Sequence, residues 1–158
     1  MQHLCVETAR PIIKDEKFKL ASNKYFSPQF GFGALDAYDF VTKAKSWPLV
    51  KPQVWIMPPP IQFEKGTMDE DKDMSGGTRL STAGVSGSIE ITKDMVDEQD
   101  FNKIEHVQIR VWVGHKRRGD IKVTLTSPRG IVSEIPRRLL DSAATGLFGW
   151  TFSSLKHW

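Results

Sequence analysis

The chain has 158 residues, of which 39% are hydrophobic and 26% charged, a composition typical of a folded domain with a modest core and not of a disordered segment. Its net charge of +3 is too small to argue for nucleic-acid binding, and no apolar run is long enough to cross a membrane. Residues 2–10 lack the apolar core of a secretory signal peptide, and the single cysteine, Cys5, cannot form a disulfide within the chain.

A first helix is predicted over Met1–Ala9. Leu4, Cys5 and Thr8 recur at helical spacing, and Pro11 ends the run. No capping residue precedes this helix, so we expect it to be the cut end of a longer segment.

A second helix is predicted from about Gly33 to Lys45. Its apolar stripe consists of residues 34, 37, 41 and 44, and Trp47-Pro48 stops it. Prolines at positions 48, 52 and 58–60 then indicate an extended linker. The shift in composition predicts two parts, residues 1–47 and residues 48–158.

Residues 64–88 are acidic and glycine-rich and are predicted to form a long loop. Residues 88–92 alternate between polar and apolar types, which predicts a strand. The sequence leaves open how any short strands between Val54 and Ser88 pair.

The strongest strand signal lies between Glu105 and Gly130. Apolar residues occupy alternate positions over 107–113 and again over 121–125, the pattern of two half-buried strands. We expect an antiparallel pair that closes around Arg117, with a turn made by Arg117, Arg118, Gly119 and Asp120. Ile131-Val132 begins a further strand, and residues 146–152 are aromatic.

Several motifs, in order along the chain, resemble those of kexin-like proprotein convertases, which are calcium-dependent serine endopeptidases of the subtilisin superfamily. Residues 1–4 (Met-Gln-His-Leu) are similar to the helix that follows the nucleophile region of the catalytic domain, and residues 30–37 (Phe-Gly-Phe-Gly-Ala-Leu-Asp-Ala) to the last-helix signature of that domain. Residues 104–107, 117–120, 127–130 and 149–154 are similar to the P domain, also called Homo B. The resemblance covers nearly the whole chain.

The resemblance implies a mainly β fold with an N-terminal α-helical segment. Residues 1–47 would be the C-terminal tail of a subtilisin-like catalytic domain. Residues 48–158 would be a jelly-roll-like antiparallel β-sandwich, the P domain, incomplete at its C-terminus. In this family the catalytic aspartate, histidine, asparagine and serine all lie upstream of the first helix here, so no catalytic, cofactor-binding or metal-binding residue is assigned in this chain.

By resemblance, the expected function is that of the stabilising, non-catalytic part of a kexin-like serine endopeptidase. The partner would be the subtilisin-like catalytic domain, in the same polypeptide. The parent would use calcium and cleave secretory precursors after paired basic residues in the secretory pathway, at the Golgi lumen or membrane. Membrane anchoring of the parent stays open, and this chain alone is expected to be inactive.

The residues expected to support the catalytic domain organise the sandwich and perform no chemistry. They are Val107, Ile109, Val111, Val113, Ile121, Val123, Leu125, Trp150 and Phe152.

Two basic motifs have competing interpretations. Arg118-Gly119-Asp120 is an integrin-type tripeptide, but a glycine turn with solvated charges explains it better. Lys116-Arg117 and Arg137-Arg138 are paired basic residues of the kind that such endopeptidases cleave after. We interpret them as surface charge while the hairpin stays folded, and as vulnerable sites if it opens.

The remaining motifs favour structural interpretations. Asp69-x-Asp71-x-Asp73 fails the EF-hand pattern, because Met74 and Leu80 stand where glycine and a bidentate glutamate are needed. Residues 84–88 miss the nucleophile-elbow pattern by one glycine. The four histidines are not at metal-ligand spacing: His3, His106, His115 and His157. The basic and aromatic residues near Trp112 favour packing over nucleic-acid binding.

Two alternatives to the fragment hypothesis stay open. The chain could be a stand-alone interaction module of β-sandwich type, or the product of an incomplete gene prediction with no separate function.

Overall fold

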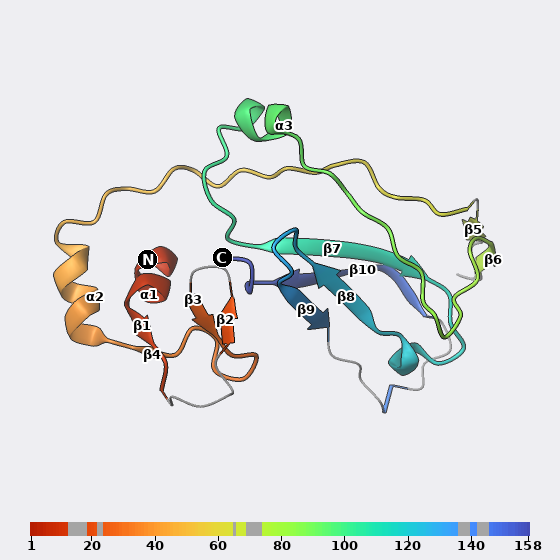
Figure 1. Cartoon of the computed structure of the whole chain (residues 1–158), viewed down its shortest axis with the longest axis horizontal. Coiled ribbons are helices and arrows are strands. Elements are labelled where there is room, and N and C mark those ends of the chain that lie inside the picture. Colours follow the sequence, from red (N-terminus) through yellow and green to blue (C-terminus); the bar gives the residue numbers. More distant parts are fainter. Residues whose placement is uncertain (13–18, 22–23, 65, 69–73, 136–139, 142–145) are drawn as a thin grey trace.

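The computed structural model describes residues 1–12, 19–21, 24–64, 66–68, 74–135, 140–141 and 146–158. Figure 1 shows a helical part at one end of the molecule and a β-rich part at the other, with a long arc of chain joining them. Helix α1 (Gln2–Thr8) and the C-terminus meet near the centre, where the rings of His3 and Trp158 lie 4.9 Å apart. The two ends of the chain therefore pack on each other.

The N-terminal part combines short strands with the two predicted helices. Strand β1 (Ala9–Arg10) pairs with β4 (Ala34–Leu35), and β2 (Lys19–Ala21) pairs with β3 (Lys24–Phe26), both antiparallel. Helix α1 begins without a side-chain cap, as predicted, and buries Leu4, Val6 and Thr8. The Thr8 hydroxyl donates to the Leu4 carbonyl oxygen at 2.7 Å, which satisfies this buried polar group inside the helix.

Helix α2 (Ala37–Ala44) is confirmed, but it starts four residues later than predicted. Ala34 and Leu35 pair with β1, so their backbone groups are not available to the helix. Asp36 then caps it by accepting a hydrogen bond from the Asp39 amide at 3.0 Å. None of the helix is buried: Val41 of the apolar stripe is 57% exposed, and its neighbour Tyr38 80%.

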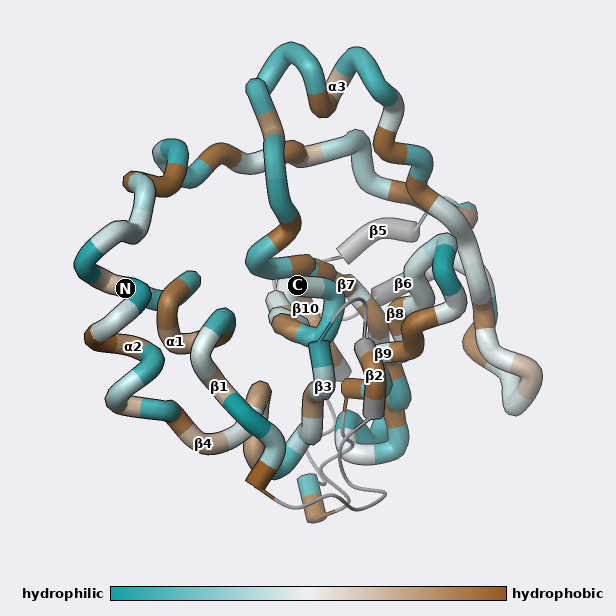
Figure 2. The backbone as a smooth tube through the Cα atoms, turned by 60° about the vertical axis from the view of Figure 1, so that its left-hand side comes forward, coloured by the Kyte–Doolittle hydropathy of each residue, from teal (hydrophilic) through white to brown (hydrophobic). Residues whose placement is uncertain are grey.

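The arc from α2 to β7 has little regular structure, as the prolines and the loop prediction indicated. It contains the small hairpin of β5 (Gly66–Met68) and β6 (Met74–Gly76), and helix α3 (Lys93–Glu98), which Thr92 caps. The predicted strand at residues 88–92 is wrong, because these residues form no strand. Ile89 and Ile91 are 50% and 48% exposed, so no neighbouring strand or core covers the alternating pattern. Figure 2 shows this segment running outside the β-rich part.

The C-terminal part consists of two antiparallel strand pairs. Strand β7 (Val107–Val113) pairs with β10 (Leu147–Ser154), and β8 (Val123–Thr126) pairs with β9 (Val132–Ile135). The predicted strands are confirmed, but the predicted hairpin of residues 107–113 with 121–125 is wrong. The alternation of apolar residues shows which face of a strand is covered, but it does not show which other strand pairs with it. Here a one-turn 3-10 helix, η1 (Arg118–Asp120), intervenes between β7 and β8.

The two strand pairs contact each other through β9 and β10, where Ser133 Oγ and Ser154 Oγ lie 2.7 Å apart. The chain is mainly β with antiparallel pairing and short helices, as predicted. The buried apolar side chains among the described residues are few and come from both ends of the chain: Leu4, Val6, Ile121, Leu147 and Trp158. A core of this size supplies limited hydrophobic stabilisation.

Candidate functional site where the two ends of the chain meet

The polar contacts between α1 and the segment that leads into β7 define what we call the junction. It consists of residues 2, 3, 7, 24, 26 and 32 from the N-terminal part and residues 103, 105, 106 and 158 from the C-terminal part. Gln2, His3 and Glu7 all belong to α1, and His3 and Glu7, four positions apart, share one face of it. The junction joins segments that are about a hundred positions apart in the sequence.

The first contacts are hydrogen bonds from the start of α1. His3 Nε2 lies 2.6 Å from Glu105 Oε1, and both side chains are mostly covered, with 16% and 25% of their surface exposed. Because a carboxylate only accepts, His3 is the donor. Beside it, Gln2 Nε2 donates to His106 Nε2 at 3.3 Å. These contacts attach the helix to the residues just before β7.

The second contact is a carboxylate between two ammonium groups. Glu7 Oε2 accepts from Lys24 Nζ at 2.8 Å, and Glu7 Oε1 lies 3.5 Å from Lys103 Nζ. The hydrogen bond from Lys24 is the main cause that lowers the pKa of Glu7, with a further contribution from Lys103, whereas partial burial opposes the shift. The Glu7 carboxylate is thus ionised and held at neutral pH.

Trp158 is the apolar centre of the junction and is only 5% exposed. Its ring meets the ring of His3 edge-on at 4.9 Å and that of Phe32 at 6.0 Å. The Lys103 ammonium lies 5.0 Å from the centre of the same ring, within the range of a cation–π contact. The junction therefore combines a buried aromatic ring with charged groups around its rim.

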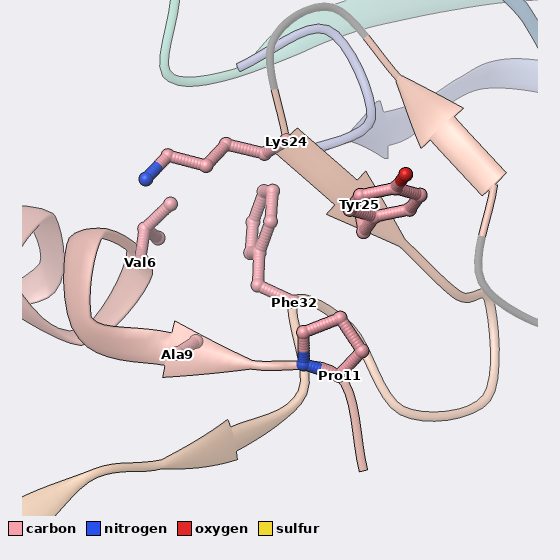
Figure 3. A pocket seen from close by; sticks show the side chains of 6 residues that line it. All are labelled: Val6, Ala9, Pro11, Lys24, Tyr25 and Phe32. Atoms are coloured by element: carbon pink, nitrogen blue, oxygen red, sulfur yellow. The ribbon is translucent and has the colours of Figure 1, made fainter. Parts of the chain in front are cut away.

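A small cavity of about 110 Å³ lies next to the junction (Figure 3). It is lined by Val6, Ala9, Pro11, Lys24, Tyr25 and Phe32. Lys24 is already paired with Glu7, so its charge is matched within the protein. The cavity is smaller than typical small-molecule sites, and we assign no ligand to it.

Ser133, Ser154 and His157 form a second polar cluster, and it raises the question of catalysis. Ser133 Oγ lies 3.0 Å from His157 Nε2, a serine–histidine geometry, but both residues are only 8% exposed. Burial, and secondly the charge of Lys156, lower the pKa of His157. A catalytic triad needs an orienting carboxylate and an accessible hydroxyl, whereas the charged neighbour here is a cation. We interpret this cluster as structural.

The residues predicted to organise the sandwich lie on the described strands or next to them. Ile121 is buried, and Val107, Ile109, Val111, Val113, Val123, Leu125 and Phe152 are half-buried. Trp150 departs from the expected core position, because it is 39% exposed. Its ring contacts Phe152 at 6.3 Å and the Arg118 guanidinium at 4.6 Å, so it is partly covered from within the chain.

The predicted turn residues Arg117, Arg118, Gly119 and Asp120 connect β7 to β8, and the last three form η1. Arg118 donates from Nε to Asp141 Oδ2 at 2.8 Å, and Gly119 is buried. The tripeptide at residues 118–120 is thus partly enclosed and not displayed on an open loop.

Trp112 is 49% exposed, and the Arg110 guanidinium stacks on it at 5.0 Å. Arg110 also donates to the Gly149 carbonyl oxygen at 3.1 Å. These contacts account for the basic and aromatic side chains of β7 by packing within the protein.

Metal binding has no support in the described part of the chain, where no group of three or more His, Cys, Asp or Glu residues could hold an ion. The acidic motif Asp69–Asp73 and the basic pair Arg137-Arg138 lie outside the described residues. Within the described ranges, no helix is both long and apolar enough to cross a bilayer.

The junction residues were missed by sequence reasoning, which named His3 and His106 only as scattered histidines. Glu7, Lys103, Glu105 and Trp158 gave no periodic or motif signal for a shared site. One clue was available: residues 1–4 and 104–107 both carry motifs of the resembled family, although no pattern showed that the two motifs meet.

Comparison with known proteins places these features in context. The family profile described as proprotein convertase P-domain matches residues 104–158. The whole chain is 34% identical to a dibasic-processing endoprotease of Schizosaccharomyces pombe and covers 22% of that protein. It is 30% identical over its full length to mouse furin, covering 18% of it. Over 87% of its length it is 30% identical to kexin of Saccharomyces cerevisiae, covering 16%. The chain thus spans about a fifth of the length of these relatives.

Proposed function

This chain belongs to the kexin-like proprotein convertase family, and from that membership we propose that it is the supporting part of a dibasic-processing serine endopeptidase. In this proposal residues 1–47 are the end of the catalytic domain, residues 48–158 are P domain, and no residue of this chain carries the chemistry. The parent would cleave secretory precursors after paired basic residues, in the secretory pathway. It would use calcium bound elsewhere in the polypeptide.

One observation carries the proposal: α1 contacts both ends of residues 104–158, the segment that matches the P-domain profile. His3 bonds Glu105, and the His3 ring packs on Trp158. Residues 1–4 resemble the catalytic domain of the family, whereas residues 104–158 match its P domain. The junction therefore supports a role in which the P domain braces the catalytic domain by holding a helix of that domain.

The exposed apolar residues of α2 support the same proposal. In a complete endopeptidase the remaining catalytic domain would cover side chains such as Tyr38 and Val41, which are 80% and 57% exposed here.

A chimeric protease tests this function. The segment of the Schizosaccharomyces pombe endoprotease that aligns with this chain is replaced by the chain, and hydrolysis of a Lys-Arg peptide is measured. We expect the chimera to be active, and a version that lacks the segment to be inactive or unstable. Equal activity of the two would refute the bracing role.

The alternative is a stand-alone β-sandwich interaction module. Measurements on the isolated chain distinguish it from the bracing role. A module would melt cooperatively on its own and would not restore activity in the chimera. The purified chain by itself is expected to leave the Lys-Arg peptide intact, and inhibitor-sensitive hydrolysis by it would contradict the non-catalytic assignment.

A further inference from the structure

The run Lys116-Arg117-Arg118 lies between β7 and β8 and offers two sites to an endopeptidase that cleaves after paired basic residues. Cleavage after Lys-Arg would hydrolyse the Arg117–Arg118 bond, and cleavage after Arg-Arg the Arg118–Gly119 bond. We propose that this run is a latent cleavage site, closed by η1 and by the contact of Arg118 with Asp141, and opened when that contact breaks. The inference concerns this chain as a substrate and does not depend on the function proposed above.

Both scissile carbonyl oxygens are engaged inside the fold. The Arg117 oxygen accepts from the Asp120 amide at 3.1 Å, and His115 Nδ1 lies 2.5 Å from it. The Arg118 oxygen accepts from the Ile121 amide at 3.1 Å. A serine endopeptidase must receive the scissile carbonyl oxygen in its oxyanion hole. Neither oxygen can enter that hole until η1 has unwound.

Arg118 precedes the scissile bond at the second site and follows it at the first, and its side chain is also held. Arg118 donates to Asp141 Oδ2 from Nε at 2.8 Å and from its terminal nitrogen at 2.7 Å. Its guanidinium lies 4.6 Å from the centre of the Trp150 ring. The two side chains of the ion pair are only 23% and 16% exposed, so solvent screens the pair weakly.

The backbone adds a further bond, because the Gly119 amide donates to the Asp141 carbonyl oxygen at 2.9 Å. Asp141 therefore holds both the side chain of Arg118 and the backbone of Gly119, and it is the residue on which closure depends most.

Cleavage would be an ordinary hydrolysis. The protease serine attacks the carbonyl carbon of Arg117 or Arg118, and the C–N bond to the next residue breaks, with a proton passing to the new amino group. Water then releases the acyl group as a new carboxylate. A protease cannot reach the scissile bond while η1 is folded. The rate of cleavage therefore reports the population of the state in which η1 is locally unfolded.

The test uses the full chain, a peptide spanning residues 112–123 and a purified dibasic-specific endopeptidase. Mass spectrometry assigns each fragment, so that cleavage at Arg137-Arg138 is scored separately. We expect rapid cleavage of the peptide after Arg117 or Arg118, and cleavage of the folded chain at these bonds at least tenfold slower.

Two variants break the Arg118–Asp141 contact from opposite sides. Asp141→Asn keeps the side-chain shape and all the basic residues. Arg118→Gln keeps the Lys116-Arg117 pair and leaves only the peptide bond that follows Arg117 to be cleaved. Each is expected to raise cleavage at the run roughly tenfold, the change that ~1.4 kcal/mol of lost local stability produces. Asp100→Asn is the matched control, since Asp100 pairs with Lys51 far from the run, and its cleavage rate is expected to stay at that of the unmodified chain.

Three results would overturn the inference. They are a peptide that resists cleavage, an unmodified chain cleaved as fast as the peptide, and both variants cleaved no faster than the control. Circular dichroism distinguishes local opening from global unfolding. If one variant unfolds, the cleavage rate of the other variant decides. If both unfold, the Arg118–Asp141 contact supports the whole fold, and local control of the cleavage site is refuted.

Discussion

His3 Nε2 and Glu105 Oε1 lie 2.6 Å apart although the two residues are 102 positions apart in the chain. The bond joins the helix that opens the chain to the residues that enter β7, and the ring of the same histidine packs against Trp158. A single side chain thus contacts both ends of residues 104–158, the segment that matches the P-domain profile.

We expect Glu105→Gln to lower the free energy of unfolding by about 1–2 kcal/mol, because a partly covered, charge-assisted hydrogen bond is weakened. Urea denaturation measures the change. Asp97→Asn is the control, since the Lys93–Asp97 pair is exposed within one helix, and it should cost less than about 0.5 kcal/mol. Equal losses in the two variants would show that the junction contributes no more than a surface pair.

Trp158→Ala should be the most destabilising substitution in the junction, at about 3 kcal/mol or more, because it removes a large buried ring and its contacts with His3 and Phe32. The measurement is the same denaturation series. Trp55→Ala serves as comparison, because Trp55 is 48% exposed on the arc. A Trp158→Ala chain as stable as the Trp55→Ala chain would refute a role for this ring in the core.

Two glycines with nearly the same backbone angle separate steric cost from conformational cost. Gly146 (φ +74°) lies so close to β7 that an added Cβ would be 2.1 Å from the Val113 carbonyl oxygen, whereas Gly130 (φ +76°) has no atom within 4 Å of that position. We expect Gly130→Ala to cost about 1 kcal/mol, from the left-handed conformation alone. Gly146→Ala should cost clearly more, because the backbone of β7 must shift. Thermal melting compares them, and similar midpoints would argue against the placement of β10 beside β7.

Stability should fall as the pH is lowered through the histidine range. The pKa of His157 is depressed below its ordinary value of 6.5, mainly by burial and secondly by Lys156. The unfolded chain therefore takes up a proton at a pH where the folded chain does not. The contribution of neutral His157 to the free energy of unfolding is therefore fully present above about pH 6.5. It is lost as the pH falls toward the pKa of His157 in the folded chain.

The measurement is the melting midpoint between pH 7.5 and 5.5. His157→Gln should flatten the dependence, because the amide can still bond Ser133 and does not titrate. His115→Gln should leave the His157 contribution in place. A steeper fall of the melting midpoint with decreasing pH in the His157→Gln chain would contradict a lowered pKa of His157.

Local patterns in the sequence predicted the secondary structure where the spacing of apolar residues matched the period of one element. Alternation over residues 107–113 predicted β7, and the apolar stripe over Gly33–Lys45 predicted α2, because side-chain direction repeats with period 2 in strands and 3.6 in helices. The same reasoning failed at residues 88–92, where alternation is present but no partner strand covers it.

Sequence alone determined the class of the chain: mainly β, antiparallel, with motifs of the kexin-like family. Only the tertiary structure decided that β7 pairs with β10, that Arg118 is held by Asp141, and that His3, Glu105 and Trp158 share one site. The reason is physical. Secondary structure depends on neighbours a few residues away, whereas strand partners and ion pairs between distant segments depend on how the chain closes in space, and no short pattern encodes that.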